Sequence, residues 1–165
     1  MSMPVRIART AVAFIIAVLV TYLLAAVFYT QLVIGELGTI GVDVPFGARL
    51  QATLDDIVGL ANPVGGFMQS YAAVIVVALI VGYAAATGVK MVVKPLAPFA
   101  YPAAGAAAIG LALYLANGSQ GGIPVMAGAR EWGGFLLQMA AGLIGGVAFA
   151  LLRPHGEDGA DAVAA

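Results

Sequence analysis

The sequence predicts an all-α integral membrane protein: a four-transmembrane-helix bundle with an additional external amphipathic helix between helices 1 and 2. Of the 165 residues, 62% are hydrophobic and 9% are charged, with a mean hydropathy of +1.04, whereas soluble domains are about a quarter charged. Four apolar segments are each long enough to cross a hydrocarbon core of roughly 30 Å as a helix. A fifth, more polar segment has helical periodicity.

The first transmembrane helix is expected at about residues 11–34, after a cytoplasmic N-terminus of residues 1–10 that carries Arg6 and Arg9. A secretory signal peptide also begins with positive charge and an apolar stretch. Its apolar core is usually shorter, and the sequence around Phe28 and Tyr29 has no small-residue cleavage pattern. These features favour an uncleaved membrane helix.

The external amphipathic helix is expected at about residues 46–61, between Pro45 and Asn62-Pro63. Apolar residues recur there at helical spacing, and most polar residues lie on other faces. Such a helix lies in the membrane interface or caps the end of a bundle. Its acidic character argues against attraction to anionic lipid.

The second and third membrane helices are expected at about residues 67–88 and 96–116. The second carries a stripe of small residues at intervals of four: Ala78, Gly82 and Ala86. The third contains Pro98 and Pro102 near its start, where the first turns of a helix tolerate proline.

The fourth membrane helix is expected at about residues 131–152. One side of it carries Gly134, Gln138, Gly142 and Gly146, each four residues from the last. Small residues let membrane helices approach closely, so this stripe and that of the second helix predict packing faces. Packing within one bundle, homodimerisation and docking onto a larger complex all remain open.

The basic residues predict that both ends of the chain are cytoplasmic. With this orientation only Arg49 and Arg130 lie outside. The inner side collects the other five: Arg6, Arg9, Lys90, Lys94 and Arg153. The predicted location is the bacterial inner membrane, and residues 153–165 form a polar tail that we expect to be disordered.

Gln138 is the most deeply placed strongly polar side chain, because no charged residue falls at the middle of a predicted span. It contacts a substrate or makes an interhelical hydrogen bond, and its place on the glycine stripe favours the hydrogen bond. Nearer the outer surface, Arg130, Glu131 and Trp132 form a compact cluster that Arg49 could reach. The cluster is a partner- or headgroup-binding patch or an interfacial anchor, and the anchor is favoured.

No pattern for catalysis, metal binding or a cofactor is recognisable. The chain has no cysteine and a single histidine, His155, in the tail. Asp55 and Asp56 are adjacent, and neighbours on a helix do not face each other. The triplets at residues 47–49 and 128–130 are both Gly-Ala-Arg, which is weak support for two parallel repeats.

We therefore expect a non-enzymatic accessory or structural subunit that docks through glycine-rich helix faces. Its expected partners are membrane lipid and either a larger membrane-protein complex or further copies of itself, with no nucleic acid. A small oligomeric carrier or channel for a neutral or lipophilic molecule is the alternative. A membrane enzyme using Arg130 and Glu131 is a third, weaker possibility.

Overall fold

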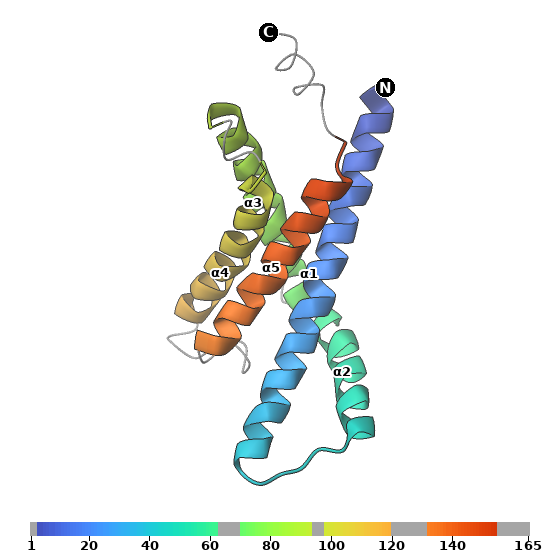
Figure 1. The fold of residues 1–165 in the computed structure, drawn as a ribbon, viewed down its shortest axis with the longest axis vertical. Helices are drawn as coiled ribbons and strands as arrows, with labels where there is room; N and C mark the ends of the chain where they lie inside the picture. The colour runs from blue at the N-terminus through green and yellow to red at the C-terminus, as the bar shows by residue number, and fades with distance from the viewer. Residues whose placement is uncertain (1–2, 63–69, 94–97, 120–131, 155–165) are drawn as a thin grey trace.

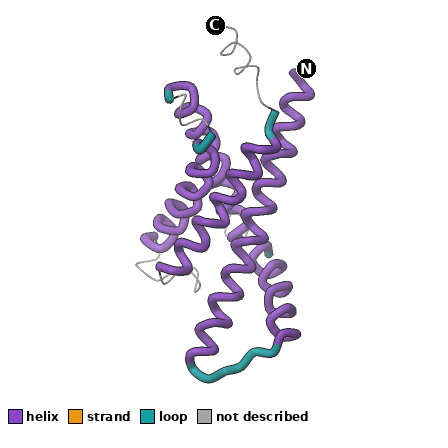
Figure 2. The backbone as a smooth tube through the Cα atoms, viewed as in Figure 1, coloured by secondary structure: helices purple, strands orange, loops and turns teal. Residues whose placement is uncertain are grey.

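The computed structural model describes residues 3–62, 70–93, 98–119 and 132–154 (Figures 1 and 2). These residues form five helices and no strand, which confirms the all-helical prediction for this part of the chain. The helices are α1 (Met3–Thr39), α2 (Phe46–Ala61), α3 (Tyr71–Val92), α4 (Ala100–Ser119) and α5 (Trp132–Leu152). By length and composition α1, α3 and α5 are able to cross a membrane, and α4 contains a shorter apolar stretch, Ala100–Ala116.

Helix α1 is much longer than the apolar run that predicted it. Its 37 residues correspond to about 55 Å, against a hydrocarbon core of roughly 30 Å. It ends where the amide of Val42 donates to the carbonyl of Leu37 (3.1 Å) and that of Gly41 donates to Gly38 (3.2 Å). This is the Schellman arrangement, and it requires a left-handed residue, which Gly41 supplies with φ of 84°.

The starts of α3 and α4 follow local chemistry. Ser70 caps α3: its hydroxyl accepts a hydrogen bond from the amide of Ala73 at 3.2 Å. Helix α4 begins at Ala100, four residues after the expected start of that span, so Pro102 falls in its first turn and Pro98 lies before it. A proline in the first turn costs little, because the first amides of a helix have no partner within the helix.

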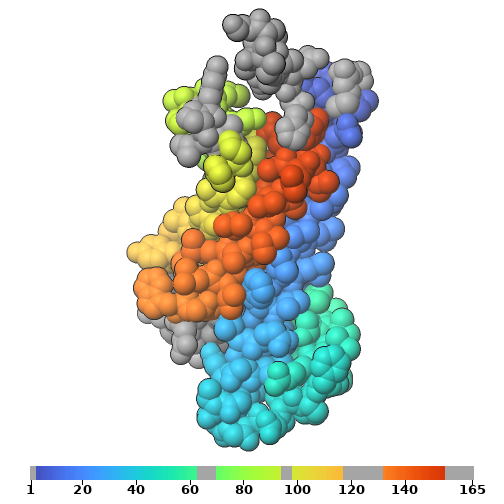
Figure 3. Space-filling view, in the orientation of Figure 1, coloured from blue at the N-terminus to red at the C-terminus, as the bar shows by residue number. Residues whose placement is uncertain are grey.

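The packing order of the helices is α3, α4, α5 and α1, and α1 also touches α3. Helix α5 crosses diagonally between α4 and α1 in Figure 1. The C-terminal part of α1 continues beyond the start of α5, and α2 runs back beside it, so that these two helices project from the rest of the molecule (Figure 3). The buried side chains come mostly from α1, α3, α4 and α5, with many alanines among them.

Candidate functional site

Gln138 of α5 joins three helices inside the bundle. It is 1% exposed. Its Oε1 accepts a hydrogen bond from the Tyr71 hydroxyl of α3 at 2.8 Å, and its Nε2 donates to the carbonyl of Ala25 in α1 at 3.1 Å. Both ends of the amide are therefore engaged by the protein. This geometry suits a side chain that holds helices together, because both polar groups of the buried amide have hydrogen-bond partners.

The glycine stripe of α5 lies inside the chain. Gly134, Gly142 and Gly146 are buried together with Gln138. A β-carbon on Gly142 would collide with the carbonyl of Gly105 in α4 and lie 2.7 Å from Cγ1 of Ile109. One on Gly146 would meet the carbonyl of Tyr101. The stripe thus allows α4 to approach α5 at backbone distance.

The other side of α5 makes an equally close contact with α1. A β-carbon on Gly145 would overlap the Thr21 hydroxyl and lie 2.9 Å from the carbonyl of Ala17. The interval-of-four stripe does not predict this contact, because Gly145 does not belong to it. The signal in the sequence is the pair Gly145-Gly146, since adjacent glycines make room on two faces of one helix.

The small-residue stripe of α3 faces α4. A β-carbon on Gly82 would lie 2.8 Å from Cβ of Ala108 and 3.1 Å from the carbonyl of Ala104. Ala86 is 4% exposed, whereas Ala78 is partly buried. Glycine and alanine at these positions permit the close crossing of α3 and α4.

An open apolar groove of about 720 Å³ runs along this α3–α4 crossing. Its walls extend from Val74 to Val89 on α3 and from Phe99 to Leu115 on α4, and every lining residue is apolar. The volume falls within the range of roughly 300–1,000 Å³ that is typical of small-molecule sites. The groove therefore suits an apolar occupant.

Helix α2 is fastened to α1 by two polar contacts. The Tyr22 hydroxyl of α1 donates to the carbonyl of Ile57. The Thr30 hydroxyl lies 2.7 Å from Oδ2 of Asp56, to which it donates. Asp55, the neighbouring carboxylate, is exposed, so the two aspartates have different surroundings.

The apolar residues of α2 divide between two faces. Ile57 and Leu60 are partly buried and pack against the core. Phe46, Leu50, Leu54 and Val58, spaced at intervals of four, are 81%, 53%, 55% and 67% exposed. We call these four residues the α2 stripe. The core therefore covers only the edge of the predicted apolar face that carries Ile57 and Leu60, and the α2 stripe is left exposed.

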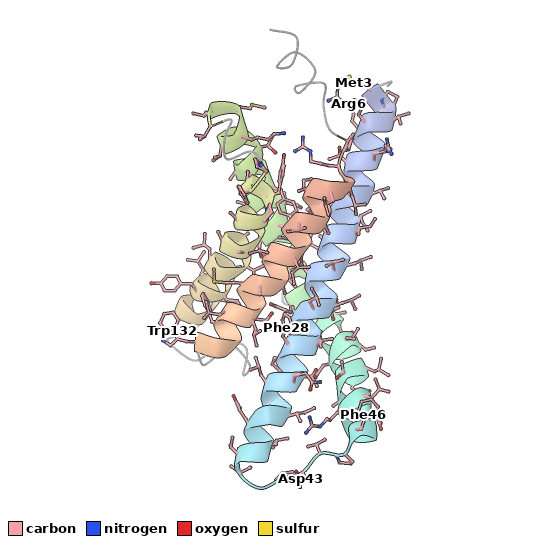
Figure 4. The ribbon with its side chains drawn as sticks, viewed as in Figure 1. Met3, Arg6, Phe28, Asp43, Phe46 and Trp132 are labelled. Atoms are coloured by element: carbon pink, nitrogen blue, oxygen red, sulfur yellow. The ribbon has the colours of Figure 1, made fainter. Side chains whose placement is uncertain are left out.

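The predicted outer cluster is described in part. Arg130 and Glu131 lie outside the described residues. Trp132 is 81% exposed, and its ring centroid lies 6.3 Å from that of Phe135. Arg49 donates from Nε to the carbonyl of Val44 at 2.9 Å. In Figure 4 Trp132 and Phe46, each near the start of its helix, lie on opposite sides of α1.

An aromatic cluster joins all four core helices at the end of the bundle nearer the N-terminus. The rings of Tyr83 and Phe149 are stacked with centroids 4.5 Å apart. Tyr101 meets both edge-on, at 5.9 and 5.0 Å, and Phe14 meets Tyr83 edge-on at 6.2 Å. The Arg153 guanidinium lies 4.7 Å from the Tyr101 centroid. No periodicity in the sequence connects these four aromatic residues, since each comes from a different helix.

Within the described residues, no group of three or more His, Cys, Asp or Glu side chains is placed to hold a metal ion. Comparison with protein-family models, with curated proteins and with solved structures found no match to this chain.

Proposed function

We propose that this chain is a non-enzymatic integral membrane protein that serves as an accessory or structural subunit of a larger membrane complex. In this proposal α1, α3, α4 and α5 all cross the bacterial inner membrane, and both termini are cytoplasmic. The 20 residues of α4 correspond to about 30 Å, which is sufficient for a span without tilt. The excess of lysine and arginine on the side of the two termini supports this orientation, because cytoplasmic segments are enriched in these residues.

The observation that carries the proposal is the exposed α2 stripe on the part of the molecule that projects beyond α5. Four large apolar side chains at intervals of four form one continuous line on a helix. Exposed apolar patches of this kind mark protein or membrane contacts, because burying them removes apolar surface from water. The stripe therefore supports docking at α2.

Docking through the glycines of α5 has less support, since α1 and α4 cover those glycines within the chain. We therefore place the partner contact on α2. The partner contributes an apolar surface to this contact, and the exposed residues Gln51 and Asp55 flank the α2 stripe outside it.

The experiment that tests this proposal compares two sets of variants in particles extracted from native membranes with a mild detergent. The double variant Leu50→Asn/Leu54→Asn removes apolar character from exposed positions and should release the chain from its complex. The matched control, Gln51→Ala/Asp55→Ala, changes the polar edge of the same helix and should leave the particle mass unchanged. Equal masses for wild type and the double variant would overturn docking at α2.

A small carrier for a neutral or lipophilic molecule is the second candidate, and the α3–α4 groove is the observation that favours it. Uptake of a lipophilic probe into liposomes that contain the purified chain would support this function. A carrier requires no second protein, so liposome activity of the lone chain separates the two candidates.

A further inference from the structure

The α3–α4 groove has a narrow floor and higher walls. Its floor is made of small residues at the helix crossing, such as Gly82, Ala104 and Ala108. Its walls carry larger, exposed side chains, among them Val81 at 64% and Leu111 at 58% exposure. Because small residues form the floor and larger side chains form the walls, the groove is elongated and matches the shape of a hydrocarbon chain.

The groove is long enough for one lipid tail. From Val74 to Val89 it follows 16 residues of α3, whose ends lie about 22 Å apart at a rise of 1.5 Å per residue. One leaflet contributes about half of the roughly 30 Å hydrocarbon core. An extended acyl chain of one leaflet therefore fits along the groove.

A positive charge lies at one end of the α3–α4 groove. Lys90, in the last turn of α3, follows Ala78, Gly82 and Ala86 at the same interval of four, so it continues the line of the groove floor by one turn. It is half-buried. Basic sites between membrane helices at the cytoplasmic surface bind anionic headgroups.

We propose that the α3–α4 groove binds one acyl chain of an anionic phospholipid, whose phosphate is held by Lys90. The groove supplies the apolar contact for the tail, and the lysine supplies the charge that distinguishes an anionic from a zwitterionic headgroup. A second copy of the chain or a partner helix would explain the apolar groove, but it would give the positive charge of Lys90 at the end of the groove no role. The charge therefore favours lipid over a helix.

The inference goes beyond the proposed function and is independent of it. The groove belongs to α3 and α4, whereas the proposed docking surface belongs to α2. A wild-type chain that is extracted in its complex but does not retain phosphatidylglycerol would refute only the lipid site. A wild-type chain that retains this lipid but keeps its particle mass in Leu50→Asn/Leu54→Asn would refute only docking at α2.

The test titrates the purified full-length chain with palmitoyl-oleoyl phosphatidylglycerol or the matching phosphatidylcholine and counts retained lipids by native mass spectrometry. We expect preferential retention of phosphatidylglycerol and about a fivefold loss of its affinity in Lys90→Gln, the size expected for one lysine at a membrane surface. The control Arg6→Gln removes a charge from α1, at the same end of the molecule and away from α3 (Figure 4). It should leave the affinity unchanged.

Two neighbouring alanines test the tail contact. Ala85 lines the groove and Ala84 does not, and both are exposed. Ala85→Leu should reduce retention of phosphatidylglycerol severalfold, and Ala84→Leu should not. Glycerol 3-phosphate, a headgroup without chains, should fail to displace the lipid.

Three results would overturn the lipid site. The first is equal affinity in Lys90→Gln and Arg6→Gln. The second is equal retention in Ala85→Leu and Ala84→Leu. The third is a dimer that Ala85→Leu dissociates, which would assign the groove to a second copy. Ala103→Leu, at an exposed lining position of α4, repeats the groove test on the other wall should Ala85→Leu fail to fold.

Discussion

Gly105 of α4 and Gly142 of α5 meet backbone to backbone, so that a β-carbon on either one would collide with the carbonyl oxygen of the other. Neither residue has a side chain that could move aside, and both backbones belong to helices. The contact joins the two helices that pack most extensively in the described part of the chain. Glycine at these two positions therefore determines how closely α4 and α5 approach.

Gly142→Ala should destabilise the bundle. Because the added methyl group meets a backbone carbonyl, the helices must separate, and overpacking of this kind costs about 1–3 kcal/mol. The measurement is thermal unfolding in detergent. Gly133→Ala is the control: its β-carbon would have nothing within 4 Å, so alanine's higher helix propensity should leave stability equal or raise it slightly. Equal melting temperatures for the two variants would contradict this contact.

Gln138→Leu should lower the free energy of unfolding by about 1 kcal/mol, since it removes the hydrogen bonds to Tyr71 and Ala25. Tyr71→Phe removes only one of them and should cost about half as much. Both variants should retain their particle mass and any activity. Loss of transport by Gln138→Leu at unchanged stability would instead assign the glutamine to a substrate route.

Tyr83→Phe should leave stability equal or raise it. The Tyr83 hydroxyl is buried and has no hydrogen-bond partner among the described residues, so removing it loses no bond and relieves an unpaired polar group. Tyr101→Phe is the matched variant, because the Tyr101 hydroxyl lies 3.2 Å from that of Thr87 and the two share a hydrogen bond. It should cost about 0.5–1 kcal/mol. A larger loss in Tyr83→Phe than in Tyr101→Phe would show that the Tyr83 hydroxyl is used.

Asp56→Ala should loosen α2 from α1, because Thr30 then loses the carboxylate to which it donates. We expect amide hydrogen exchange in Phe46–Ala61 to become about tenfold faster, which matches the net contribution of one hydrogen bond. Asp55→Ala, one residue earlier and exposed, is the control and should leave the rates unchanged. Equal acceleration in both variants would mean that helix charge, rather than the bond to Thr30, holds α2.

The sequence was sufficient to predict the helices, but it did not predict which residues of other helices each of them contacts. Apolar length predicts a span, and intervals of four predict which side of a helix packs, because both depend on the geometry of one helix. What that side contacts depends on the whole arrangement. The Tyr71–Gln138 bond joins residues 67 positions apart, and no local pattern indicates that pairing.

Two further features depend on contacts between helices. The α3–α4 groove arises because Gly82 lets α4 approach closely, while the larger side chains on either side stay apart. The continuation of α1 to Thr39 likewise exceeds its apolar run, which weakens after Tyr29 and ends at Ile34. Thr30, bonded to Asp56, lies in this part of α1, so contact with α2 accompanies the extension.

The most direct test of the central claim is the mass and composition of the particle that contains the wild-type chain, extracted from native membranes in a mild detergent. We predict a complex in which this chain is stoichiometric with a larger membrane protein and crosslinks to it from position 54 of α2. A lone monomer or homo-oligomer, with crosslinks from that position only to lipid, would contradict the accessory-subunit function.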